Sequence, residues 1–189
     1  MPTLNITRDE ALNLLKTHIK NENMIKHCLA TEAVMKALAK KLGEDENLWA
    51  MAGLLHDLDS ELVNADMKTH GLKTAEILKE KGLPAELIEA VKMHNEHATG
   101  QKRTDKFHRA LAAGETVTGM IIATALVYPD KKLASVKVKS ITKRMKDKRF
   151  AASVDRDIIK ECEDISVPLQ EFVELSLNAM QEISDDLGL

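Results

Sequence analysis

Four segments of the sequence each place a group that could bind a metal ion on an otherwise apolar helical stripe: His27, His56, His94 and Glu115. His56 is followed by Asp57, so a nitrogen donor and an anionic oxygen stand side by side in LLHDLD. Buried ionisable groups must be paired, neutralised or coordinated. One inward histidine is usually a satisfied core residue, but this number of groups, with an adjacent carboxylate, suits a divalent ion such as Zn, Mn, Fe or Co. We therefore expect a metal site between facing helices.

The elements that must position these groups are helices. Apolar residues recur at helical spacing over residues 23–42 and 70–81 and in segments that begin near residues 7, 44, 84 and 107, whereas no segment alternates as a strand does. Thr7 and Glu10 have the spacing of a capping box, Gly43 and Gly82 end two helices, and Pro84 opens another. The sequence predicts an all-α helical bundle.

The composition changes after Pro129. Residues 131–149 are strongly basic, and helices are predicted over residues 154–164 and from about residue 168 to residue 183. We therefore divide the chain into a metal-binding helical core, residues 1–128, and a C-terminal helical extension, residues 129–189, packed on that core.

Charge and composition exclude several classes of protein. The net charge of −3 predicts no general attraction to nucleic acid or to an anionic membrane. No apolar run approaches the roughly 18 residues of a membrane span, and MPTLNITRDE lacks the basic start and apolar run of a secretory signal. Cys28 and Cys162 are expected to be free thiols in a reducing cytoplasm. The oligomeric state is not indicated.

The order His27, His56-Asp57, Glu115 resembles the HD superfamily of metal-dependent phosphohydrolases. In that family a histidine, a His-Asp pair and a distant aspartate bind one metal ion in a helical bundle. The contexts NMIKHCLATEAVMKALAKKLG, AGLLHDLD and ALAAGETVTGMI resemble the surroundings of those ligands, and the resemblance covers roughly residues 20 to 125. The chain departs from the family at Glu115, where aspartate is usual. The longer side chain moves the carboxylate by about one C–C bond, which can shift affinity, metal preference or the position of the bound water.

Some branches of the superfamily hold a second metal ion on two further histidines, with the aspartate of the His-Asp pair as a bridge. The segments MKTHGLKTAEILKEKG and AVKMHNEHATG resemble that arrangement and nominate His70 and His94. For His70, an exposed polar residue at a helix start is an almost equal alternative. The resemblance thus implies one or two divalent ions per chain, chosen from Mn, Fe, Co, Ni and Zn.

The activity that the resemblance implies is hydrolysis of a small phosphate ester, plausibly a nucleotide, by a metal-activated water. A divalent ion lowers the pKa of bound water from 15.7 to roughly 7 in favourable sites. Asp57 would bind the metal and orient the water, and Asp59 or Glu61 would orient a ligand or transfer a proton. A solvated loop after the helix explains Asp59 and Glu61 slightly better.

Positive charge near the ligands could bind the phosphate of the substrate. Lys92, Lys102 and Arg103 lie beside ligand segments, and Arg144 lies in the basic stretch. The substrate-binding candidates that we select are Lys73, Lys139, Lys143 and Arg149. A charge run is more often a solvated helix face, and the sequence contains no glycine-rich phosphate loop.

Two other functions stay open. The same ligands could hold a two-iron centre of the kind that some HD-like proteins use for oxidative cleavage. The glutamate at position 115 and the basic stretch also fit a non-catalytic module that senses a nucleotide.

Overall fold

Helices account for all regular secondary structure between residues 4 and 189, the part of the chain that this computed structural model describes. Residues 1–3 lie outside the described residues. They belong both to the predicted core, residues 1–128, and to the N-terminal segment MPTLNITRDE. The longer elements are α1 (Arg8–His18), α2 (Glu22–Leu42), α3 (Glu46–Leu55), α4 (Leu72–Glu80), α5 (Ala85–Met93), α7 (Lys106–Leu126), α8 (Val138–Met145), α9 (Arg156–Asp164) and α10 (Leu169–Glu182). The short ones are α6 (Glu96–Thr99), the 3₁₀ helix η1 (Leu133–Ser135) and α11 (Ser184–Leu187). The predicted all-α fold is confirmed.

Most helix ends follow the chemistry of their capping residues. Thr7 and Glu10 form the predicted capping box, in which each side chain accepts a hydrogen bond from the other residue's backbone N–H. Gly43 ends α2 in the left-handed conformation, with φ of 72°. Pro84 immediately precedes α5, where its missing N–H costs no helical hydrogen bond.

One boundary and one added helix near His70 and His94 differ from the sequence prediction. The segment predicted to be helical from residue 70 becomes α4 only at Leu72, because Gly71 has a φ of 89° that a right-handed helix cannot contain. The short helix α6 was not predicted. It begins after Asn95, whose side chain accepts a hydrogen bond from the backbone N–H of His97.

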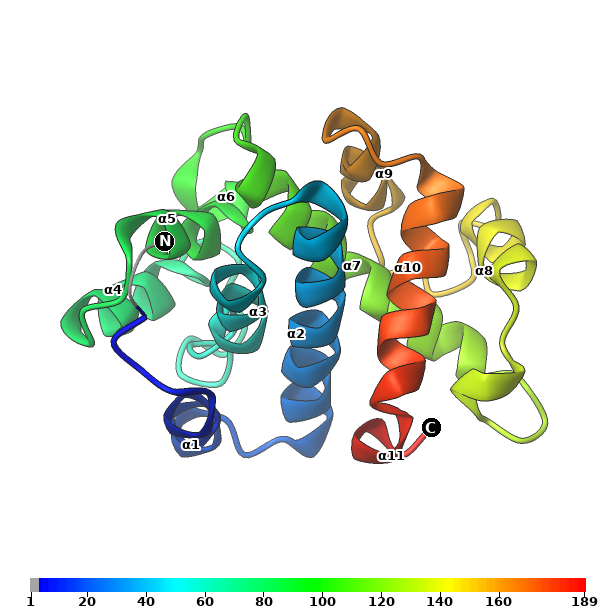
Figure 1. Ribbon diagram of the computed structural model, residues 1–189, viewed down its shortest axis with the longest axis horizontal. Helices are drawn as coiled ribbons and strands as arrows, with labels where there is room; N and C mark the ends of the chain where they lie inside the picture. The colour runs from blue at the N-terminus through cyan, green and yellow to red at the C-terminus, as the bar shows by residue number, and fades with distance from the viewer. Residues whose placement is uncertain (1–3) are drawn as a thin grey trace.

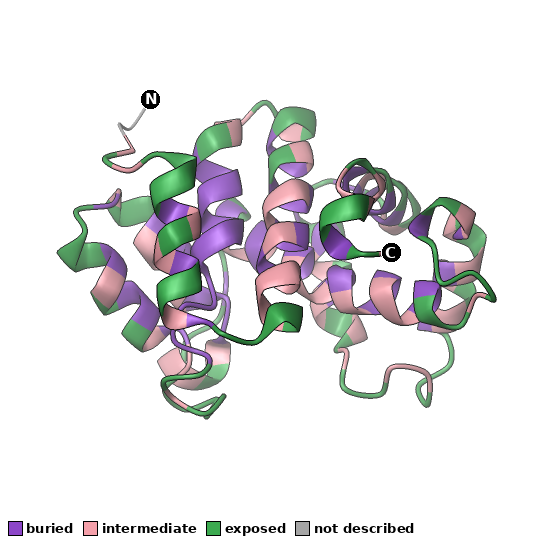
Figure 2. Ribbon diagram, turned by 90° about the horizontal axis from the view of Figure 1, so that it is seen from below, coloured by how far each residue is buried: buried purple, intermediate pink, exposed green. Residues whose placement is uncertain are grey.

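The long helices α2 and α7 form the centre of the bundle. α2 packs against α3, α7 and α10, and α7 also packs against α9 (Figure 1). Buried positions gather on the faces that the helices turn toward one another, and exposed positions face outward (Figure 2). Trp49 is only 3% exposed and stacks on Phe107 with ring centroids 4.9 Å apart, so it is a core residue.

The C-terminal helices extend the same hydrophobic core. Phe172 and Val173 of α10 are fully buried among residues of the helices that precede residue 129, and Ile159 and Cys162 of α9 are buried with them. Cys28 and Cys162 are both free thiols. The division of the chain at residue 128 stays a prediction. None of the described helices is long and apolar enough to cross a membrane.

Close packing of α2 against α3 depends on Gly53. A Cβ atom at this position would lie 2.7 Å from the backbone oxygen of Thr31, a distance that real Cβ atoms do not show. The two helices can therefore approach only because residue 53 has no side chain. His56 follows Gly53 by three residues, so this contact also sets the position of the His-Asp pair.

Replacing Gly53 with alanine is expected to lower the free energy of unfolding by about 1–3 kcal/mol, because backbone must move to admit the methyl group. Urea denaturation followed by circular dichroism measures the change. Gly119→Ala is the matched control, since this glycine is also helical and its added Cβ would meet only a side-chain methyl of Val154 at 3.3 Å. The control should be neutral or stabilised by up to about 1 kcal/mol through helix propensity. Equal stability of both variants would contradict the packing argument.

Candidate metal centre

Four parts of the bundle bring five of the predicted ligands together. His27 lies on α2, and the pair His56-Asp57 directly follows α3. His70 lies in the turn before α4, and His94 caps the C-terminal end of α5. His56 is fully buried, and Asp57 and His94 are 6% and 7% exposed. The structure therefore places four imidazoles and one carboxylate in a single buried cluster.

The Asp57 carboxylate is the point on which the imidazoles converge. Its Oδ1 lies 3.1 Å from Nε2 of His70, 3.2 Å from Nε2 of His56 and 3.7 Å from Nε2 of His94. Its Oδ2 lies 3.6 Å from Nε2 of His27. The histidines form two pairs, with Nε2 atoms 3.2 Å apart in the pair His27–His56 and 3.1 Å apart in the pair His70–His94. One carboxylate thus serves two pairs of histidines.

Helix ends orient two of the rings. The carbonyl groups of the last helical turn have no partner inside the helix, and both His56 and His94 use one of them. Nδ1 of His56 donates to the Gly53 carbonyl at 2.9 Å, and Nδ1 of His94 donates to the Val91 carbonyl. A carbonyl can only accept, so in the neutral ring the proton is on Nδ1 and Nε2 carries a lone pair.

Side chains orient the other two rings. The Thr118 hydroxyl donates to the Glu115 carbonyl at 2.7 Å, so it accepts from Nδ1 of His27 at 3.0 Å. Nδ1 of His70 lies 2.8 Å from Oδ1 of Asp59, which can only accept when ionised. In its neutral form, each of the four rings would therefore turn the lone pair of Nε2 toward Asp57.

This donor set fits a divalent cation. Lone pairs that face each other at 3.1–3.2 Å beside a carboxylate repel unless a proton or a cation lies between them. Two nitrogen ligands at about 2.1 Å from one ion are about 3.0–3.4 Å apart, which agrees with both pairs. The ligand atoms of His27, His56 and Asp57 lie within 4.8 Å of one another, and so do those of Asp57, His70 and His94. The two sets share Asp57.

The pKa values show how the metal-free cluster balances its charge. Burial lowers the pKa of His56 to about 3 and also lowers the pKa values of His27 and His94, so these rings are neutral near pH 7. Burial acts in the same direction on His70, but its hydrogen bonds to Asp57 and Asp59 outweigh it and raise the pKa to about 10. A proton on His70 thus occupies the place that a cation would take, and metal binding must displace it.

Glu115 lies at the edge of the cluster. Its Oε2 is 3.9 Å from Nε2 of His27, and its Oε1 accepts a hydrogen bond from the Thr116 hydroxyl at 2.6 Å. It belongs to neither of the two sets whose ligand atoms lie close together. Burial raises the pKa of Glu115 to about 8, and the negative charge of Asp57 adds to this effect. Its role as a metal ligand stays a prediction.

The two acidic residues that follow the His-Asp pair have separate partners. Asp59 is fully buried: its Oδ1 faces Nδ1 of His70, and its Oδ2 accepts from the backbone N–H groups of Gly71 and Thr74 at 2.8 and 3.0 Å. Asp59 therefore orients His70 and fixes the start of α4. Glu61 is exposed, and the structure does not bring it to the cluster.

The carboxylate of Glu61 instead joins two helices. Its Oε1 accepts from the backbone N–H groups of Lys20 and Asn21 at 2.9 and 2.7 Å, in the connection between α1 and α2. These contacts hold the start of α2 near the turn that follows α3.

A hollow of about 620 Å³ opens over Asp57, His70, His94 and Glu115. Its basic lining residues are His97, Lys102 and Arg103, so none of the four selected substrate-binding candidates lines it within the described chain. Lys73 pairs with Glu76 on the exposed face of α4, and Arg149 pairs with Asp147. Lys139 and Lys143 lie on the exposed face of α8.

Arg103 connects the hollow to the C-terminal helices. It is 5% exposed and donates to the His94 carbonyl at 2.9 Å and to both carboxylate oxygens of Glu161 at 2.6 and 2.9 Å. The sequence places Arg103 beside a ligand segment, but only the folded chain shows that it joins α9 to the end of α5. Asp155, Asp157 and Ile158 of the α9 region also line the hollow.

Replacing Asp59 with asparagine is expected to weaken divalent metal binding about 10- to 100-fold, because the ring of His70 loses its anionic partner. Isothermal titration with Mn²⁺ measures the change. Glu61→Gln removes the same charge two residues away and should bind Mn²⁺ as the parent protein does, since Glu61 contacts only backbone N–H groups outside the cluster. Equal losses of Mn²⁺ affinity in both variants would show that Asp59 has no specific role in metal binding.

Glu115 should make the metal-free protein depend on pH. Its raised pKa means that the folded chain holds a proton more tightly than the unfolded chain, so its contribution to stability is complete below about pH 4.5 and is lost as the pH rises through about 8. Glu115→Gln cannot ionise. The melting temperature of the variant minus that of the parent, both measured in EDTA by circular dichroism, should therefore increase from pH 5 to pH 8. A constant difference in melting temperature over that range would show that the pKa of Glu115 is not raised.

Comparison with known proteins agrees with this geometry. Residues 24–128, more than half of the chain, match the HD domain family. Ribonuclease Y of Fusobacterium nucleatum is 27% identical over 96 residues, which cover 50% of this chain and 19% of the relative. Ribonuclease Y of Opitutus terrae is 32% identical over 77 residues, which cover 40% of this chain and 14% of the relative. The match thus spans about a fifth or less of the length of these relatives.

The matched range begins three residues before His27 and includes every histidine of the cluster together with Asp57 and Glu115. Proteins with this domain bind divalent metal ions, and the donor set described above could hold one. The chain belongs to the HD domain family.

Proposed function

We propose that the protein is a metal-dependent phosphohydrolase that cleaves a small phosphate ester such as a nucleotide. The observation that carries the proposal is the convergence of two histidine pairs on the Asp57 carboxylate at the base of a hollow. If each of the two ligand sets that share Asp57 held a divalent ion, the site would supply positive charge for both the attacking and the leaving oxygen in displacement at phosphorus.

The chain's own residues have distinct roles in this proposal. His27, His56 and Asp57 would hold one divalent ion, and Asp57, His70 and His94 would hold the other. When bound, such ions acidify water and offset negative charge on a phosphoryl group.

The burial of Asp57 and the position of Glu115 support these roles. The 6% exposure of Asp57 keeps bulk water from its carboxylate and strengthens its interactions with cations. Glu115, whose Oε2 lies 3.9 Å from Nε2 of His27, would accept a proton at the edge of the cluster.

The size of the hollow suits a small substrate. Its volume of about 620 Å³ suits a nucleotide-sized molecule. Lys102 is 89% exposed at the side chain and pairs with Glu96 at 2.7 Å, so it can leave that carboxylate for a phosphate at little cost. The relatives named Ribonuclease Y act on RNA by name, which supports phosphodiester hydrolysis as the reaction class.

Elemental analysis after reconstitution with Mn²⁺ should find about two equivalents per chain, because the two ligand sets share only Asp57. His94→Ala should retain about one equivalent and His56→Ala should lose at least one, whereas Glu115→Ala should load more weakly. His18→Ala is the control, since this histidine lies on α1 with its ring bonded to the Leu14 carbonyl. Loss of metal in the His18 variant would show that the losses are not specific.

Hydrolysis of bis(p-nitrophenyl) phosphate should follow the metal content of the same preparations. His56→Ala is expected to reduce kcat/KM at least about 100-fold, because a metal ligand is lost, and His18→Ala should leave it unchanged. A fully loaded protein that binds nucleotides without hydrolysing any phosphate ester would favour the sensing module. Retained iron with a visible absorption band and oxygen consumption would favour the two-iron oxygenase.

A further inference from the structure

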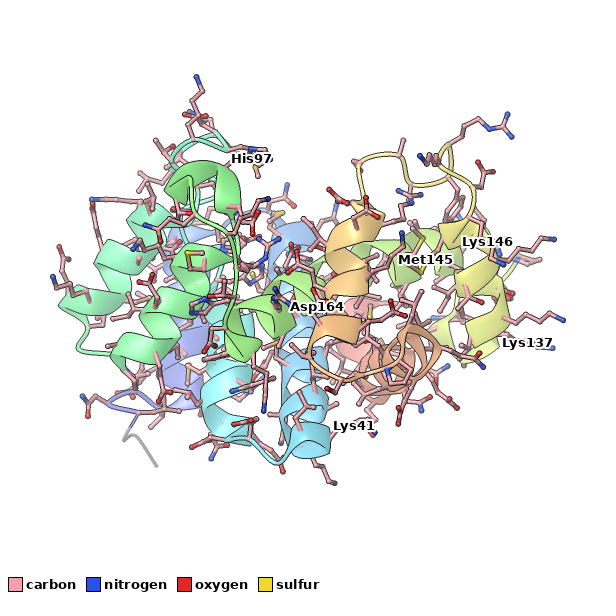
Figure 3. The ribbon with its side chains drawn as sticks, turned by 90° about the horizontal axis from the view of Figure 1, so that it is seen from above. Lys41, His97, Lys137, Met145, Lys146 and Asp164 are labelled. Carbon is pink, nitrogen blue, oxygen red and sulfur yellow. The ribbon has the colours of Figure 1, made fainter. Side chains whose placement is uncertain are left out.

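The function proposed above makes no use of the basic stretch, residues 131–149. Its helix α8 buries Ile141 and Met145 and exposes lysines along the other face. Figure 3 shows Lys137 and Lys146, which flank the two ends of this helix, well to one side of His97, and Asp164 of α9 lies between His97 and these lysines. α9 therefore stands between the basic surface and the hollow over the metal centre.

A second hollow, of about 720 Å³, lies between α8 and α9. We call it the α8–α9 groove, and its charged lining residues are Lys146, Lys148, Asp155, Arg156, Asp157 and Lys160. Asp155 and Asp157 also line the hollow over Asp57, so the two hollows meet at the first turn of α9. A ligand that passes over this turn would contact both.

The cations of the groove are less neutralised than the anions. Asp155 accepts hydrogen bonds from the backbone N–H groups of Asp157 and Ile158, and Asp157 pairs with Lys160 at 2.8 Å. Within the described residues, Lys146 and Lys148 have no carboxylate partner. The groove is therefore positively charged although the chain as a whole is not.

Arg156 adds a charge that is held in place by backbone alone. Its guanidinium group donates to the carbonyls of Asp147, Phe150, Ala151 and Val154 in the connection between α8 and α9. Its Nε is buried and has no hydrogen-bond partner. The guanidinium group is therefore fixed in position at the groove by these backbone contacts.

We propose that the α8–α9 groove binds backbone phosphates of a single-stranded oligonucleotide whose scissile phosphodiester lies at Asp57. This inference rests on the hydrolysis proposed above, and it names the substrate class. A helix with its side chains is about 10–12 Å wide, so one phosphate group cannot occupy both hollows across the first turn of α9. The ligand must therefore carry phosphates along an extended chain.

The lining residues favour recognition of phosphate rather than of bases. No aromatic ring of Phe, Tyr or Trp lines either hollow in the described part of the chain, and stacking on such rings is the usual means of holding unpaired bases. Lysines bind phosphate as point charges without reading sequence. The groove should thus bind strands of different sequence with similar affinity and with a strong dependence on salt.

The double variant Lys146→Gln/Lys148→Gln tests the groove, and Lys139→Gln/Lys143→Gln is its matched control. Both remove two charges from the basic stretch, but Lys139 and Lys143 do not line the groove. Arg156 is kept because it holds the 147–154 connection together. Fluorescence anisotropy measures binding of a labelled single strand of about twelve nucleotides to the full chain over a range of salt concentrations.

The groove variant should bind the strand about tenfold more weakly and lower the slope of log K against log salt by about 1.4, as expected for two lost phosphate contacts. The control should change binding less than about twofold. With manganese-loaded protein, the groove variant should lose a similar factor in kcat/KM for the strand and keep the parent rate on bis(p-nitrophenyl) phosphate, which has only one phosphate.

Three outcomes would overturn the inference. Equal losses of affinity for the strand in the two double variants would indicate a diffuse electrostatic attraction to the basic stretch. No loss of affinity in either variant would show that the groove does not bind the strand. Lysine-dependent binding to phosphatidylserine vesicles without binding to the strand would point to a membrane surface. Failure of the proposed function looks different: the groove variant would still lose binding, while the loaded parent protein would hydrolyse neither substrate.

Discussion

The structure depends on one buried carboxylate shared by two pairs of imidazoles. Asp57 lies within 3.7 Å of Nε2 atoms of His56, His70 and His94 and 3.6 Å from that of His27. Such a cluster is unfavourable in an apolar core unless positive charge balances it. In the metal-free chain a proton on His70 does so, and a divalent ion would do so more completely. The cluster thus lowers the stability of the fold and in return forms a site that can bind a cation.

Helix ends make this arrangement rigid. The free carbonyls of Gly53 and Val91 orient His56 and His94, while Asp59 holds His70 and also accepts from the backbone at the start of α4. The same contacts that end or begin a helix therefore set the direction of each ring. Gly53 therefore acts on the site in two ways: its carbonyl orients His56, and its missing side chain permits the approach of α2 to α3.

Helical periodicity accounts for what the sequence could predict. His27 and Glu115 lie inside long helices, and His56 and His94 continue the stripes of α3 and α5, so their inward direction follows from spacing. The irregular turn over residues 56–71 follows no such period, because its shape depends on hydrogen bonds from Gly71 and Thr74 to Asp59. The sequence could therefore nominate Asp59 and Glu61 together but could not separate their roles.

Nearness in sequence to a ligand does not determine which cations line the hollow. Lys73 follows His70 by three residues, yet its side chain pairs with Glu76 on the exposed face of α4. Residues from α9 instead complete the wall of the hollow, and Arg103–Glu161 and Arg109–Asp164 pairs fasten that helix to the HD domain. The matched range ends at residue 128, before this wall begins. The cluster around Asp57 therefore lies within the matched domain, whereas part of the wall of the hollow comes from α9, which the domain match does not include.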